Sequence, residues 1–130
     1  MNAYVVDTHA LLWHLQNDKR LGAKAAALFE EADVYFFIPT IVLCELSRLS
    51  LKGKSKHNLQ AVIDILHGDP RFEIVSLDES TVSLLPSALE IHDAIIVATV
   101  LALKKSKKIT SKLITWDSMI SKSGLVETVW

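Results

Sequence analysis

Four acidic residues adjoin long runs of apolar residues, where a carboxylate is least expected. Asp7 ends the first apolar run of the chain, and Glu45 lies inside a later one. Asp93 opens the apolar stretch 94–103, and Asp117 directly follows another. Carboxylates are almost never fully buried unless they are paired or bound to a metal ion. Four such acids, spread through the chain, indicate that the fold gathers them into one pocket.

A pocket of this kind has a predictable chemistry. Carboxylates that share a pocket repel one another unless the pocket also holds protons or a hard divalent cation. Mg²⁺ usually keeps several waters and takes one or two carboxylates as ligands. Water bound to such an ion is easier to deprotonate, and the ion offsets charge on a phosphate during its transfer. The four acids therefore predict a metal site suited to phosphate chemistry.

Composition restricts the class of protein. The chain has 130 residues and is half apolar, which is enough for one domain with a real core and excludes disorder. Its longest nearly unbroken apolar run, 94–103, is about half of the roughly 20 residues that a membrane-spanning helix needs. We see no signal peptide, and the single cysteine, Cys44, allows no internal disulfide. We therefore expect a cytoplasmic protein with no membrane segment.

The charge balance is compatible with RNA as a partner but does not require it. The chain has 14 basic and 15 acidic residues, for a net charge of −1, which argues against a strongly basic nucleic-acid binder. Without the four pocket acids, the 14 basic residues outnumber 11 acidic ones. The remaining surface is mildly basic, and a bound divalent ion would reduce the repulsion between the pocket and phosphate.

Segments typical of strands and helices alternate along the chain. Buried or β-branched runs predict strands over 3–7, 34–38, 72–77, 112–116 and 125–129. Helical patterns with caps and breakers predict helices over 8–17, 22–32, 39–51, 56–67, 79–85, 92–105 and 117–122. This alternation predicts an α/β fold over residues 1–130, a single-domain three-layer α/β/α sandwich with a mainly parallel central sheet.

The predicted fold can bring the four acids together. Ligands bind outside the carboxyl ends of the strands in such sheets, where Asp7 and Asp117 are expected. Asp93 falls in the first turn of its helix, where the positive dipole end favours an anion. Glu45 falls about two turns into the helix that follows the second strand. These positions can converge at one edge of the sheet.

With these residues in view, the chain resembles the PIN-domain nucleases, and within them the VapC-like toxins of toxin–antitoxin pairs. The acids are separated by 38, 48 and 24 residues. The matching segments are 5–13, 39–46, 92–99 and 113–117, so the resemblance covers essentially the whole chain. One departure is Trp116, because many relatives have Arg or Lys just before the fourth acid.

The resemblance implies a Mg²⁺- or Mn²⁺-dependent endoribonuclease. Asp7, Asp93 and Asp117 would contact the ion directly or through water. Glu45 would bind the ion through water or accept a proton from the water that attacks the phosphodiester. Thr115 would orient a site carboxylate or water. Small relatives form homodimers and bind a short antitoxin whose C-terminal segment lies across the acidic groove.

Plainer interpretations remain open for several residues. Asp117 and Asp93 could each cap the helix that follows, and Thr115 could be an ordinary strand residue. Thr8 could support the site carboxylates, although we expect it to cap the first helix. Cys44 is expected to be a buried structural thiol.

Two other functions also remain open. One is a PIN-type nuclease that processes RNA and has no toxin role. The other is an α/β module that binds metal or protein without catalysis. A short neighbouring reading frame with a DNA-binding N-terminal part would favour the toxin over both alternatives.

Overall fold

The structure is a computed structural model that describes residues 2–130. The strands are β1 (Asn2–Val6), β2 (Val34–Pro39), β3 (Phe72–Val75), β4 (Ser111–Ile114) and β5 (Thr128–Val129). The helices are α1 (Thr8–Leu15), α2 (Ala23–Glu30), α3 (Thr40–Leu51), α4 (Leu59–His67), α5 (Glu79–Val82), α6 (Ile91–Lys107) and α7 (Ser118–Ser123). Each predicted strand and helix is present. The largest differences are a later start for α4, which Asn58 caps through the amide of Ala61, and a final strand of only two residues.

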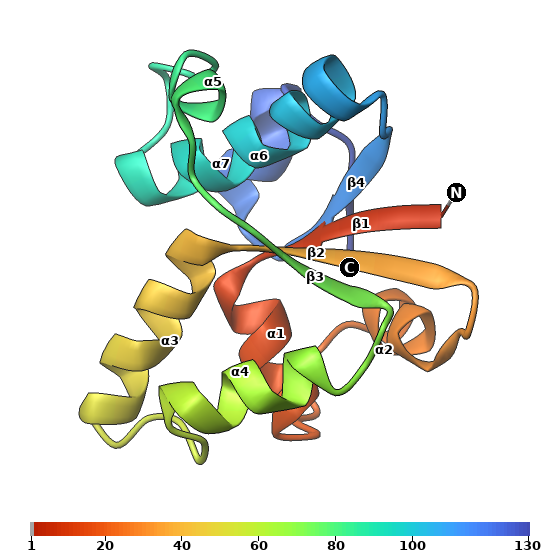
Figure 1. Cartoon of the computed structure of the whole chain (residues 1–130), viewed down its shortest axis with the longest axis vertical. Helices are drawn as coiled ribbons and strands as arrows, with labels where there is room; N and C mark the ends of the chain where they lie inside the picture. Colours follow the sequence, from red (N-terminus) through yellow and green to blue (C-terminus); the bar gives the residue numbers. More distant parts are fainter. Residues whose placement is uncertain (1) are drawn as a thin grey trace.

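The five strands form one sheet in the order β3-β2-β1-β4-β5, and every strand pair in it is parallel. Helices α1 to α4 cover one face and α5 to α7 the other (Figure 1). This confirms the predicted three-layer α/β/α sandwich. The chain proceeds from β1 outward to β3 and then returns to the other side of β1, so the order reverses between β1 and β4. Ligands of such sheets bind outside the carboxyl ends of the strands at this switch point.

The core lies on both faces of the central strands. Val5 and Val6 of β1, and Leu113 and Ile114 of β4, are fully buried. Helices on both faces exclude water from these strands, which is why the strands are almost continuously apolar. Helix α6 is buried over most of its length, as its sequence predicts. The sheet therefore provides a rigid base for side chains at its edges.

Stacked rings attach the α1–α4 layer to the sheet. Phe36 of β2 stacks on Phe29 of α2 at 4.7 Å and on Phe72 of β3 at 4.9 Å, measured between ring centroids. His14 of α1 stacks on Phe29 at 3.9 Å, and its burial lowers the pKa of its imidazole. An uncharged imidazole suits this apolar stack.

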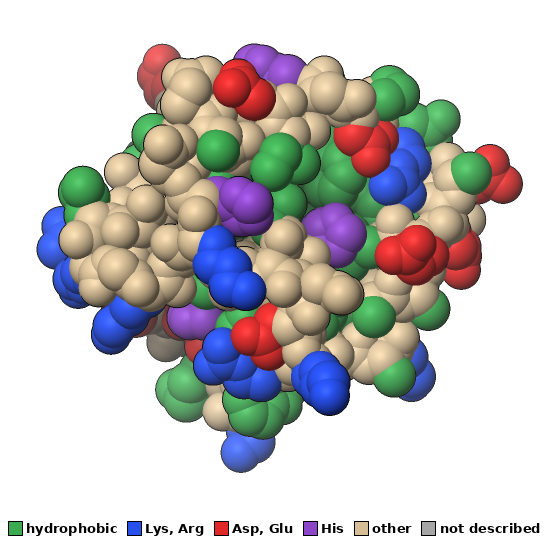
Figure 2. All heavy atoms as spheres, turned by 90° about the horizontal axis from the view of Figure 1, so that it is seen from below, with side chains coloured by type: hydrophobic (Ala, Val, Ile, Leu, Met, Phe, Trp, Pro, Cys, Tyr) green, Lys and Arg blue, Asp and Glu red, His purple; other side chains and the backbone are tan. Residues whose placement is uncertain are grey.

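One prediction about the surface of the protein is wrong. Cys44 was predicted to be buried, but it is exposed, because α3 buries Val42, Leu43 and Leu46 and turns Cys44 outward. Among residues 2–130, no helix combines the length and apolarity needed to cross a bilayer. The outer face of the α1–α4 layer mixes acidic, basic and histidine side chains with apolar ones, so it is not uniformly basic (Figure 2).

We predict that Phe36→Ala lowers the free energy of unfolding by about 3–5 kcal/mol, because Phe36 is fully buried and contacts two other rings. Urea denaturation measures the change. The matched control is Tyr35→Ala, since the neighbouring Tyr35 is 43% exposed and should cost far less. Equal losses for the two variants would contradict this description of the core.

Candidate functional site

The four acids singled out in the sequence line one cavity of about 390 Å³ at the carboxyl edge of the sheet. The other lining residues are Thr8, His9, Trp13, Ile96 and Trp116. A cavity of about 450 Å³ lies at the opposite edge, but its one carboxylate, Glu127, lies 3.6 Å from the ammonium of Lys112. The carboxylate chemistry is therefore concentrated in the smaller cavity.

Asp7 and Asp117 come from the two strands that flank the switch point. The backbone amide of Asp7 donates a hydrogen bond to the carbonyl of Ile114 at 3.2 Å, which joins the ends of β1 and β4. Beyond β4, the amide of Asp117 donates to the hydroxyl of Thr115 at 3.0 Å. These bonds hold two acids that are far apart in sequence at adjacent strand ends.

Both acids also cap the helices that follow them. Asp7 Oδ1 accepts from the amide of Ala10 at 2.9 Å, and Asp117 Oδ1 accepts from the amide of Ile120 at 3.0 Å. The capping interpretation of Asp117 is therefore correct, and it applies to Asp7 as well. In both residues the cap uses Oδ1, so Oδ2 is not committed to it. Capping thus fixes each side chain without occupying the whole carboxylate.

Glu45 reaches the cavity from the second turn of α3. Its Oε1 accepts a hydrogen bond of 2.6 Å from the hydroxyl of Thr8, which is buried in the first turn of α1. The prediction that Thr8 caps α1 is wrong, because the carboxylate of Asp7, one residue earlier, takes that role. The Thr8 hydroxyl is thereby free to orient Glu45.

Asp93 lies in the first turn of α6, and Glu90, not Asp93, is the cap of that helix. Glu90 accepts from the amides of His92 at 2.9 Å and Asp93 at 3.3 Å. Sequence reasoning did not assign Glu90 a place near the site. The signal that could have found it is an acid three residues before Asp93, at the start of an apolar helix.

Electrostatics show that the acids affect one another. The pKa of Asp93 is raised to about 6, mainly by desolvation and then by the charges of Asp117, Glu90, Glu45 and Asp7, in that order. Desolvation by burial also raises the pKa of Asp7, against hydrogen bonds from Thr115 and Ala10 that lower it. The cavity therefore disfavours negative charge unless a cation enters it.

The side chains fit a hard cation by type but do not form a closed cage around one. Within the described residues, no three His, Cys, Asp or Glu side chains are arranged to hold a metal ion by themselves. The four acids present carboxylate oxygens only, the ligand type that Mg²⁺ and Mn²⁺ prefer. Because Mg²⁺ commonly takes one or two carboxylates and fills its other positions with water, this open arrangement is compatible with it.

Comparison with known proteins gives a family and a fold. The family model for the PIN domain matches residues 4–123. A search of curated proteins gives no match.

Two solved structures have the same fold at low sequence identity. One is titled "Crystal structure of VapBC2 from Rickettsia felis bound to a DNA fragment from their promoter", with a TM-score of 0.66, 17% identity, and coverage of 98% of this chain and 97% of the other. The second is a toxin–antitoxin complex from Klebsiella pneumoniae, with a TM-score of 0.61, 21% identity, and coverage of 98% and 96%.

We predict that Asp93→Asn stabilises the metal-free protein at neutral pH. The pKa of Asp93 is raised from 3.8 to about 6, so the folded state holds this proton more tightly than the unfolded state does. The stability that the proton contributes is present at low pH and is lost as pH rises from about 4 to about 6. With divalent ions chelated, the variant should unfold at a higher temperature than the parent at about pH 7.5, and the two should coincide near pH 4.

The control for this prediction is Asp78→Asn. The amide and hydroxyl of Thr81 lower the pKa of Asp78, which caps α5. That substitution should therefore destabilise the protein at neutral pH. An Asp93→Asn variant that is no more stable than its parent at neutral pH would contradict the repulsion described here.

Proposed function

Because the chain belongs to the PIN domain family, we propose that it is a Mg²⁺- or Mn²⁺-dependent endoribonuclease and the toxin of a type II toxin–antitoxin pair. The observation that carries the proposal is the convergence of Asp7, Glu45, Asp93 and Asp117 on one cavity. An acidic cavity by itself repels a polyanion. Its function therefore depends on a cation that both the carboxylates and a phosphate can approach.

The residues divide into ligands and a proton acceptor. Asp7, Asp93 and Asp117 would hold the ion, directly or through water, from the ends of β1 and β4 and the start of α6. The ion, when bound, makes water easier to deprotonate and offsets charge on the phosphate. The raised pKa of Asp93 is what a ligand site without its cation should show. Filling the site would favour the ionised form.

Glu45 is the proton acceptor in this proposal. Its Oε1 accepts the hydrogen bond from Thr8, so Oε2 is the atom available to take the proton of the attacking water. The water oxygen then bonds to phosphorus as a phosphorus–oxygen ester bond breaks, and the departing sugar oxygen takes up a proton from solvent. No covalent bond to the protein forms. Thr8 fixes the orientation of the Glu45 carboxylate. The Thr115 hydroxyl accepts from the backbone amide of Asp117 and so fixes the backbone of that residue.

The proposed partners are RNA, a cognate small antitoxin and a second copy of the chain. The antitoxin is supported by the family resemblance, which implies a segment lying across the acidic groove. Exposed apolar side chains, such as Leu51 on α3 and Val82 on α5, offer area that a protein partner could cover. Because cellular RNA is the proposed substrate, the cytoplasm is the compartment in which this activity would operate.

We predict that the purified protein cleaves mixed cellular RNA at discrete positions with Mg²⁺ and does not do so with a chelator. Asp93→Asn should lower the rate by at least about 100-fold, the upper end of what losing a partner of a metal ligand costs. Gel analysis of labelled RNA measures this. The control is Asp33→Asn, an exposed acid before β2 that should keep full activity. Full activity of Asp93→Asn would reject the site assignment.

Thr8 provides a separate test of how Glu45 is positioned. Thr8→Val keeps the shape of the side chain but removes the hydroxyl that donates to Glu45, so we expect a fall in kcat of about 10–100-fold. Thr8→Ser restores a donor and should recover most of the loss. If the valine variant is as active as the parent, or the serine variant as impaired as the valine one, this hydrogen bond does not position the base.

A further inference from the structure

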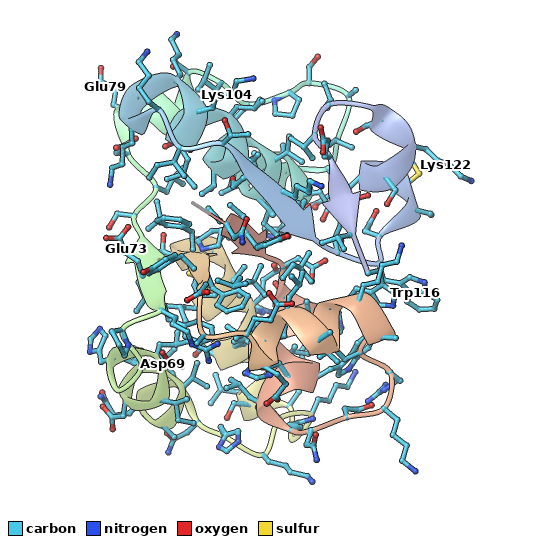
Figure 3. The ribbon with its side chains drawn as sticks, turned by 90° about the vertical axis from the view of Figure 1, so that its right-hand side faces the viewer. Asp69, Glu73, Glu79, Lys104, Trp116 and Lys122 are labelled. Atoms are coloured by element: carbon cyan, nitrogen blue, oxygen red, sulfur yellow. The ribbon has the colours of Figure 1, made fainter. Side chains whose placement is uncertain are left out.

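An exposed tryptophan stands at the rim of the acidic cavity. Trp116 lines the cavity with Asp117, the next residue, yet 70% of its surface is exposed. Trp130 stacks against it with ring centroids 6.3 Å apart and an angle of 20° between the ring planes. In Figure 3, Trp116 projects outward, on the same side of the molecule as Lys122. A large indole left in solvent beside a functional cavity has no role in packing the core.

Trp116 belongs to a row of rings along this wall of the cavity. Trp130 also meets Trp13 edge-on at 5.7 Å, and His9 lies 5.4 Å from Trp13. The guanidinium of Arg20 lies over the Trp13 ring at 4.9 Å from its centroid. Of the three tryptophans in this row, Trp116 is the one that both lines the cavity and is largely exposed, next to the carboxylate of Asp117.

The charges that line the cavity leave the binding of a nucleic-acid strand to groups other than basic side chains. Its lining within residues 2–130 contains no Lys or Arg, so no lysine or arginine there can hold the phosphates of a bound strand. Proteins that bind single strands combine backbone contacts with bases stacked on aromatic side chains, and stacking tolerates any base because each has a π-face. In this cavity the rings are the groups suited to hold a strand, and a cation among the acids would hold one phosphate.

We propose that Trp116 is the stacking platform for an unpaired base of single-stranded RNA, and that the stacked base places the adjoining phosphodiester over the carboxylates. This inference rests on the proposed function and specifies its substrate as an unpaired strand. A base inside a duplex has both faces covered by its neighbours, so the platform selects against double-stranded RNA.

The platform is held in place before the strand arrives. The residues on both sides of Trp116 are linked, because the amide of Asp117 donates to the hydroxyl of Thr115. Asp117 is fixed in turn by its cap to Ile120. Trp130 supports one face of the indole, so less side-chain entropy is lost when a base stacks on the other. Because Trp116 and Asp117 are consecutive residues, the backbone limits how far a base stacked on Trp116 can lie from Asp117.

A protein partner is the other class of molecule that could cover this ring. The surroundings favour a base. Trp116 is followed by Asp117 and Ser118, and the next exposed apolar side chain along the chain is Met119, with Ser121 and Lys122 beyond it. Along this segment the two exposed apolar side chains are separated by polar groups, a pattern that favours one base stacked on a single ring over an extended apolar interface.

The experiment measures binding without turnover, in the Asp93→Asn background with Mg²⁺. The probe is a short, fluorescently labelled single-stranded RNA of mixed sequence, followed by anisotropy, and its duplex with the complementary strand serves for comparison. The substitutions are Trp116→Ala, Trp116→Leu and Trp116→Phe, with Met119→Ala as the matched control on an exposed neighbour. Circular dichroism and thermal unfolding confirm that each variant folds, as expected for a side chain so exposed.

We expect Trp116→Ala and Trp116→Leu to weaken single-strand binding by roughly 10- to 100-fold, the range that loss of one base–aromatic stack produces. Trp116→Phe and Met119→Ala should stay close to the parent, and the duplex should bind weakly to all. Unchanged affinity of Trp116→Ala would overturn the proposal and would favour the alternative in which a protein partner covers the ring. Unchanged affinity of Trp116→Leu would overturn it too, because it would show that an apolar contact suffices without stacking.

The proposed nuclease function and the platform can fail separately. If the unsubstituted protein cleaves RNA and Trp116→Ala binds single strands normally, the platform is wrong and the function stands. If RNA is never cleaved but single-strand binding depends on the ring at position 116, the platform stands without the enzyme.

Discussion

Repulsion among partly buried carboxylates is the constraint on which the functional edge of this protein depends. Asp7, Glu45, Asp93 and Asp117 line one cavity, and the pKa of Asp93 is raised by burial and by the charges of the other three. A fold that keeps such a cluster loses stability at neutral pH unless a cation offsets the charge. The apolar core, two of whose residues, Trp13 and Ile96, also line the cavity, offsets this cost. Asp7 and Asp117 are held by the ends of buried strands, and not by contacts inside the cavity.

The same hydrogen bonds serve the fold and the site. The caps from Asp7 and Asp117 start α1 and α7, and they also restrict the two side chains next to the cavity. The bond from Thr8 to Glu45 joins α1 to α3 and orients the proposed base. Structural and catalytic interpretations of these acids are therefore not alternatives. A substitution at Asp7 or Asp117 should change both stability and activity, which is why Asp93, which caps no helix, is the cleaner position for tests.

The fold and the gathering of the acids were predictable, because both follow from periodic patterns and from acids placed after apolar runs. The features that could not be predicted from the sequence are set by contacts between residues that are not neighbours in a local pattern. Nothing local shows that Asp7 takes the cap from Thr8, or that α3 turns Cys44 outward. The pairing of Trp116 with Trp130 joins the end of β4 to the end of the chain, and no spacing rule predicts it. Glu90 could have been found from its position before α6, since an acid there is a common cap.

The central claim is that Asp7, Asp93 and Asp117 hold a divalent cation in the cavity that they share with Glu45. The most direct measurement is the anomalous scattering of a crystal soaked in Mn²⁺. We predict a single dominant peak inside the cavity, within coordination distance of at least one oxygen of Asp7, Asp93 or Asp117. A cavity without such a peak, while Mn²⁺ occupies sites elsewhere on the molecule, would contradict the account.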